Sequence, residues 1–248
     1  MRSYLSIRNS LSFFTISILL LGFSAPRSFG QKPRIPTGGR VAVVVDERLA
    51  ALRAAPNLSA RLEQRLSRGR YVAIVGAQRS ADGLIFYDVK VSRRKHGWLQ
   101  AGAVVSATQV KDDDRLLRLL HGSEDFDLIV RARIFLDTFP RSPLRPAALL
   151  LYAEAAEAAA GKLSRDASRR LNHNEMAAGG SPEFSYFMNF NGLDRYNRQG
   201  IRFVFDPVGK GFHYDGTAWR EIVRRYPQSA EAAEARKRIG TPKVAAGK

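Results

Sequence analysis

The sequence predicts a β + α protein of two parts: a small β-barrel over residues 40–107, and a helical domain over residues 112–240 with an inserted β-hairpin. Three observations predict this fold class. Short β-branched segments with period-two spacing run from Arg40 to about Ser106. From Asp112 the apolar residues follow a helical spacing. Period-two spacing then returns at residues 201–206.

The composition excludes several classes of protein. Of the 248 residues, 45% are hydrophobic, which is too many for an intrinsically disordered chain. The sequence has no cysteine, so it has no disulfide framework, no thiol nucleophile and no cysteine-ligated zinc. The net charge of +17 indicates an anionic partner and says nothing about the fold.

Residues 1–30 are typical of a secretory signal peptide. An apolar run from Leu11 to Phe23 follows two arginines, and it is shorter than the roughly 20 residues that span a bilayer. An uncleaved membrane anchor is the alternative. We expect an exported protein, periplasmic or extracellular, with no transmembrane segment in the mature chain. A Pro- and Gly-containing linker over residues 31–39 and a disordered tail over residues 241–248 complete the expected organisation.

Five short segments are predicted strands. They are Val41–Val45, Tyr71–Val75, Leu84–Val91, Gly97–Leu99 and Val104–Val105. Period two puts four residues of the third segment on one face, namely Ile85, Tyr87, Val89 and Val91. Residues 59–67 also fit a helix, because Leu62 and Leu66 have helical spacing.

Helices are predicted from the acidic run at Asp112 onward, since acidic residues favour a helix N-terminus. The expected helices cover residues 112–121, 124–139, 147–160, 166–176, 217–226 and 229–239. Glycine is expected to end the first and third of these, at Gly122 and Gly161, and proline the second, at Pro140.

The β part resembles a bacterial SH3-like domain. The resemblance is carried, in order, by Leu49–Pro56, Gly69–Val75, Phe86–Val91 and Gly97–Leu99. Members of that family are mostly non-catalytic modules that bind peptidoglycan or peptides. The resemblance therefore implies a ligand site, for which the candidate residues are Phe86, Tyr87, Arg93, Arg94, Lys95 and Trp98.

The helical part is similar to tetratricopeptide repeats of exported envelope proteins. The motif that carries this similarity occurs twice, as Phe139-Pro140-Arg141-Ser142 and as Tyr226-Pro227-Gln228-Ser229, each followed by alanines. Such repeats form helical hairpins, and the resemblance implies a protein partner. The candidate contacts for that partner are Tyr152, Tyr196 and Trp219.

An aromatic-rich insert, residues 182–216, separates the two motif copies. Residues 201–206 and 212–214 are predicted to form a hairpin whose Ile201, Phe203 and Phe205 share one face. The aromatic side chains either fill the core between hairpin and helices or line a groove for a sugar, peptide or partner helix. The core interpretation is favoured, because an isolated hairpin is only marginally stable.

Catalytic and metal-binding motifs are absent from the sequence. The four histidines lack metal-ligand spacing, and we expect no metal and no cofactor. One alternative remains, an envelope hydrolase that uses Asp194, His213 and Asp215 of the insert.

The charge is concentrated on the β part. Residues 31–111 carry +10, whereas residues 112–248 carry +4. Nucleic-acid binding through Arg68, Arg70 and the Arg93–Lys95 segment is a second alternative, which the signal peptide makes less favourable. We expect a non-catalytic exported adaptor: its β part would bind an envelope polymer such as peptidoglycan, or a peptide, and its helices would bind a protein partner.

Overall fold

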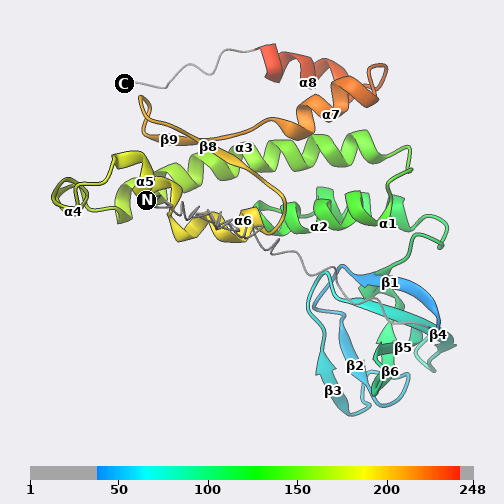
Figure 1. Cartoon of the computed structure of the whole chain (residues 1–248). Coiled ribbons are helices and arrows are strands. Elements are labelled where there is room, and N and C mark those ends of the chain that lie inside the picture. Colours follow the sequence, from blue (N-terminus) through cyan, green and yellow to red (C-terminus); the bar gives the residue numbers. More distant parts are fainter. Residues whose placement is uncertain (1–37, 241–248) are drawn as a thin grey trace, which may run out of the picture. The chain divides into compact units, whose positions relative to one another are not determined.

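The structure is a computed structural model that describes residues 38–240. The predicted signal peptide, most of the predicted linker and the predicted tail lie outside these residues. Figure 1 shows that the chain has mixed β and α content, with strands first and helices after them. The fold class predicted from the sequence is therefore confirmed at this level.

Seven strands form one antiparallel sheet of order β3-β2-β6-β5-β4-β1-β7 (Figure 1). The strands are β1 Arg40–Val44, β2 Ala51–Arg53, β3 Leu62–Arg65, β4 Tyr71–Arg79, β5 Ile85–Ser92, β6 Lys95–Gln100 and β7 Val104–Val105. Within residues 38–240, the edge strands β3 and β7 do not pair, so hydrogen bonds do not close the sheet into a barrel. Residues 62–65, which also fitted a helix, form strand β3.

The four residues that period two places on one face of strand β5 are not equally buried. Val89 and Val91 are buried and Tyr87 packs against the same core, as period two predicts. Ile85 is 43% exposed, because it pairs with Arg79 at the end of the hairpin.

The helices are α1 Asp112–His121, α2 Asp125–Thr138, α3 Arg145–Arg170, α4 His173–Ala178, α5 Glu183–Met188, α6 Asp194–Asn197, α7 Thr217–Arg225 and α8 Glu231–Gly240. Short 3-10 turns cover Ala101–Ala103 and Asn191–Leu193. Helix α3 continues through Gly161 for another nine residues, so the prediction that Gly161 ends a helix is wrong. The packing of β9 (Gly211–Tyr214) along α3 favours this longer helix.

The two copies of the repeated motif have the same turn geometry. The Phe139 N–H donates to the carbonyl of Phe135 (2.9 Å) and the Tyr226 N–H donates to the carbonyl of Ile222 (2.8 Å). Each serine N–H then donates to the carbonyl of the aromatic residue, at 3.2 Å for Ser142 and 3.0 Å for Ser229. The motif thus joins α2 to α3 and α7 to α8 as two helical hairpins, and α3 packs against α7.

The insert contributes to the core of the helices. Strands β8 (Phe203–Asp206) and β9 form the predicted hairpin, and the Phe212 N–H donates to Ser164 Oγ of α3 at 2.7 Å. Seven aromatic side chains of residues 184–219 are buried in one core cluster: Phe187, Phe190, Tyr196, Phe203, Phe212, Tyr214 and Trp219. The core interpretation of these aromatics is confirmed.

Candidate anion-binding surface

Five basic residues lie at or near one end of the β5–β6 hairpin. Residues Arg93 and Arg94 form its turn, where Ser92 pairs with Lys95. Lys90 lies across from His96 on the neighbouring strand. Arg70 reaches the same end, since its Nη2 donates to the carbonyl of Val91 at 3.3 Å. These residues are here called the hairpin cluster: Arg70, Lys90, Arg93, Arg94 and Lys95.

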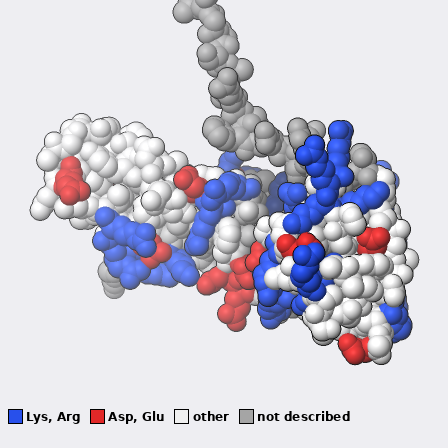
Figure 2. All heavy atoms as spheres, turned by 90° about the horizontal axis from the view of Figure 1, so that it is seen from below, with Lys and Arg blue, Asp and Glu red and all other residues white. Residues whose placement is uncertain are grey.

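The hairpin cluster has unbalanced charge. Within the described part of the chain, none of its five members forms an ion pair with Asp or Glu. Elsewhere on the sheet Arg48 pairs with Asp46 at 2.9 Å and Arg61 with Glu63 at 2.6 Å. Figure 2 shows Lys and Arg side chains gathered over the sheet with fewer acidic side chains among them. An anionic ligand would supply the missing counter-charge.

The aromatic residues predicted for this site do not join it. Phe86 is fully buried, so its predicted contact with a ligand is wrong. Trp98 pairs with Asp88, and side chains alternate along β5, so Trp98 and Tyr87 point to opposite faces of the sheet. The Tyr87 ring packs on the core, with the Arg40 guanidinium 5.6 Å from its centroid. A ligand on one face cannot touch both rings.

Arg68, predicted as part of a nucleic-acid footprint, is occupied by an ion pair. Its guanidinium contacts Asp127 of α2 at 2.7 Å and 3.2 Å, and its side chain is only 12% exposed. This hydrogen-bonded pair lowers the pKa of Asp127 below its ordinary value, against the opposing effect of burial. Arg68 therefore joins the sheet to the helices, and its assignment to a binding surface is wrong.

The three residues predicted to bind a protein partner lie in the core. Tyr152 is buried, which raises the pKa of its hydroxyl to about 12, and that hydroxyl donates to the carbonyl of Gln199 at 3.0 Å. Tyr196 is buried as well, with the Phe126 ring at 5.3 Å. The buried Trp219 donates from Nε1 to the Glu157 carboxylate at 2.8 Å. The assignment of these residues to a partner surface is wrong, because all three side chains are buried.

The alternative catalytic group has separate structural roles for its members. His213 lies 3.6 Å from the Asp206 carboxylate, which belongs to the paired strand β8. Asp215 accepts hydrogen bonds from the N–H and the hydroxyl of Thr217 at the start of α7. Asp194 is the first residue of α6. Within residues 38–240, no three His, Asp or Glu side chains are arranged to hold a metal ion.

Sequence reasoning missed two features of the surface. Lys90 belongs to the hairpin cluster through its cross-strand position, a signal available from its place three residues before the turn. The junction between sheet and helices was also missed. There Arg131 is buried, and it donates to the carbonyl of Val45 (3.1 Å) and to Ser123 Oγ (2.5 Å).

No protein family, characterised protein or solved structure matches this chain. Each helix in the described residues is too short or too polar to cross a membrane.

Proposed function

We propose that the protein is an exported, non-catalytic adaptor whose sheet binds an anionic polymer of the cell envelope at the hairpin cluster. One observation carries this proposal. Five cationic residues lie at or near one end of a hairpin without acidic partners among the described residues. Such a cluster attracts a polyanion and releases its counterions on binding.

The finer fold assignments belong to the same proposal. We infer that the sheet is a divergent SH3-like domain and that the α2–α3 and α7–α8 hairpins are two tetratricopeptide-like repeats. The matching hydrogen bonds of the two motif turns and the packing of α3 against α7 support the second assignment. A protein partner of the helices is also proposed, although not through Tyr152, Tyr196 or Trp219.

The polymer proposal is tested by co-sedimentation of residues 31–248 with purified cell-wall peptidoglycan that carries its anionic polymers. A variant with Arg93, Arg94 and Lys95 changed to Gln removes three charges from the hairpin cluster. Its matched control changes three exposed arginines of the helical part to Gln, namely Arg165, Arg170 and Arg224.

We expect the hairpin variant to bind more weakly and the control to bind like the unaltered chain. The slope of log affinity against log salt should fall by about 2 for three lost contacts to a flexible polyanion. Equal weakening of both variants would show that only the overall charge matters. No binding at low salt would contradict the proposal itself, and tighter binding to single-stranded DNA than to wall polymer would favour nucleic acid.

Export has its own test. The protein recovered outside the cytoplasm should begin near Gln31 by N-terminal sequencing. A chain that stays in the cytoplasm with residues 1–30 attached would contradict export.

A further inference from the structure

A groove lies between the first strand of the sheet and the end of α2. Its first section, of about 450 Å³, is bounded by the start of β1, by residues 105–108 and by the last turn of α2. A second section, of about 630 Å³, is lined by residues 109–111 and by the α2–α3 turn. The sections share Ala107 and Thr138, so they form one elongated groove.

Beyond Val43 the edge of β1 that borders this groove has no strand partner among the described residues, although the Val41 carbonyl accepts a hydrogen bond from Ser106 Oγ. Strand β7 pairs with β1 only at Val43 and Val44. The Val44 N–H donates to Arg70 on the β4 side and the Val45 N–H to Ala103 on the other side. Since backbone groups alternate along a strand, the Val41 N–H points away from β4, beyond the two residues of β1 that pair with β7. Unpaired strand edges are sites at which another strand can add.

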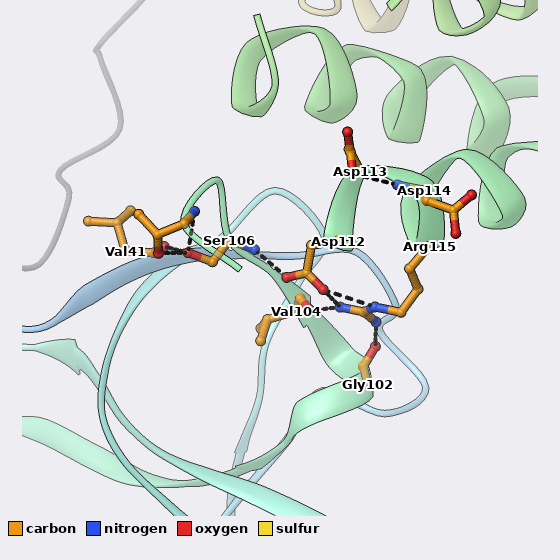
Figure 3. A network of polar contacts seen from close by, with 9 residues as sticks. Val41, Gly102, Val104, Ser106, Asp112, Asp113, Asp114 and Arg115 are labelled. Atoms are coloured by element: carbon orange, nitrogen blue, oxygen red, sulfur yellow. Dashed lines mark hydrogen bonds and ion pairs between the residues drawn. The ribbon is translucent and has the colours of Figure 1, made fainter. Parts of the chain in front are cut away.

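The wall opposite this edge is held in place by the polar network in Figure 3. Ser106 Oγ donates to the carbonyl of Val41 at 2.6 Å, and the Ser106 N–H donates to the Asp112 carboxylate at 2.8 Å. Arg115 contacts Asp112 at 3.2 Å and donates to the carbonyls of Gly102 (3.0 Å) and Val104. The groove is therefore preformed, which lowers the entropy cost of binding.

Two polar atoms at the groove have unused hydrogen-bonding capacity. Arg40 Nε and Thr138 Oγ1 are buried and have no hydrogen-bond partner within residues 38–240. Buried polar groups without a partner are costly, and a ligand that supplies carbonyl groups would satisfy them if the two side chains turned toward it, since both atoms are shielded from solvent.

The free charge of the groove is positive. Of its two acids, Asp137 pairs with Arg133 at 3.0 Å, and Asp113 keeps its negative charge while it accepts a hydrogen bond from Ser142 Oγ at 2.6 Å, so three bases face one unpaired acid. The bases that line it are Arg40, Lys111 and Arg141, and none of them forms an ion pair with a described residue. Charge complementarity thus favours an acidic ligand.

We propose that this groove binds an extended, acidic peptide segment of a partner protein, which adds as a strand beside β1. The chain's own residues 31–37 are a poorer occupant, because they contain Lys32 and Arg34 and no acid. The groove is a different surface from the hairpin cluster, and the inference does not depend on polymer binding.

The test uses residues 31–248 and an eight-residue peptide of alternating Glu and Val, with the Lys-Val peptide as its charge-reversed control. We expect the acidic peptide to shift the amide resonances of Val41 and Ala107 and to slow exchange of the Val41 amide. Changing Lys111 and Arg141 to Glu should lower its affinity at least tenfold, since both side chains are exposed. Changing exposed Arg170 and Arg224 to Glu serves as the matched control.

A second variant, Val41→Pro, removes the edge N–H without removing a β1–β4 hydrogen bond. This proline variant should no longer bind the acidic peptide. If it does not fold, the variant with Lys111 and Arg141 changed to Glu still tests the proposal. Equal binding of the Lys-Val peptide would overturn the proposal. So would the absence of amide shifts at about 1 mM acidic peptide, a concentration at which even a weakly binding peptide occupies the groove. Shifts at Val41 on deleting residues 31–37, or on raising protein concentration, would assign the groove to the chain itself or to a second copy and would also overturn it.

Discussion

At the scale of single residues, the contacts between sheet and helices depend on two arginines. Arg68 forms an ion pair with the more exposed Asp127. Arg131 donates hydrogen bonds to the carbonyl of Val45 and to Ser123 Oγ. Burial lowers the pKa of Arg131, with the neighbouring charge of Arg68 acting in the same direction. The partners of the two side chains differ in exposure, because Asp127 is 59% exposed whereas Val45 and Ser123 are buried, so the two arginines should contribute differently to stability.

Loss of the Arg68–Asp127 pair should have a small, pH-dependent effect. The folded pKa of Asp127 lies below its ordinary value of 3.8, so its contribution is present above about pH 4 and is lost as the pH falls through the folded pKa. We expect Asp127→Asn to lower the free energy of unfolding by under about 1 kcal/mol at pH 7, because the Asp127 side chain is 59% exposed. Urea unfolding at pH 7 and pH 2.5 measures this. A difference that grows at pH 2.5 would contradict the assignment.

Loss of Arg131 should be more costly. Arg131→Met leaves the Val45 carbonyl and Ser123 Oγ without their donor in a buried region, and we expect a loss of about 2–4 kcal/mol. The control is Arg133→Met on the same helix, where an exposed pair with Asp137 is lost and the expected cost is under about 1 kcal/mol. Equal costs in urea unfolding would show that the buried contacts of Arg131 do not matter.

At the scale of elements, helix α3 is the main departure from the sequence-based expectation. It spans 26 residues and includes Gly161, with Leu163 and Ala167 buried beyond that glycine. Glycine weakens a helix but does not end it when packing holds both flanks. The contact of β9 with α3 supplies that packing.

Replacement of Gly161 tests the continuity of α3. An added Cβ would meet only Arg165 Nη1 at 3.6 Å, so Gly161→Ala should stabilise the protein by about 0.5–1 kcal/mol. Gly180 is the contrast, because its φ of +68° disfavours any side chain, and Gly180→Ala should destabilise by about 1 kcal/mol. Thermal unfolding measures both. A destabilised Gly161→Ala variant would indicate that α3 is broken there.

The sequence predicts local structure well and burial less well. The hairpin at Phe203–Tyr214 and both motif turns follow from nearby residues, because period and turn chemistry are local. The length of α3 does not follow, since it depends on β9, some 40 residues later in the chain. Tertiary contacts of this kind carry no local signal.

The candidate site shows the same limit. The turn residues Arg93 and Arg94 were predicted at the surface, as hairpin turns are. Phe86 was misassigned because the local sequence around an aromatic residue in a strand does not show whether its side chain is exposed or buried. Trp219 of helix α7 was misassigned because its burial depends on packing against residues distant in the sequence, such as Glu157 of α3.

At the scale of the whole molecule, part of the sheet joins the core of the helices, while the remaining buried residues of the sheet form a core of their own. Val43 and Val45 from β1 and its end, with Val105 of β7, belong to the same buried cluster as Leu116 and Ile129 of the helices. A shared core couples the stability of the two parts, so each should unfold only with the other.

The two tryptophans make this coupling measurable, because Trp98 lies in the sheet and Trp219 in the helical part. Each single-tryptophan variant, Trp98→Phe or Trp219→Phe, reports on one part. Fluorescence of the remaining tryptophan and far-UV circular dichroism should give coincident urea transitions in each variant. Val45→Ala should shift both transitions together by about 2 kcal/mol, since Val45 is fully buried. Two separate transitions would show that the parts unfold independently.

The distance in sequence between the two motif copies also sets the delay between the synthesis of α3 and the synthesis of α7. Helix α3 is complete at Arg170, but α7, which packs against it, is complete only at Arg225. At ribosomal rates of about 5–20 residues per second, α7 is complete about 3–11 seconds after α3, and until then the face of α3 that packs against α7 has no partner. During that interval the nascent chain presents Leu163 and its neighbours to other chains and to chaperones. The long aromatic insert thus contributes much of the core of the folded protein. Because it lies between α3 and α7, it also prolongs the time for which the apolar face of α3 is exposed during synthesis.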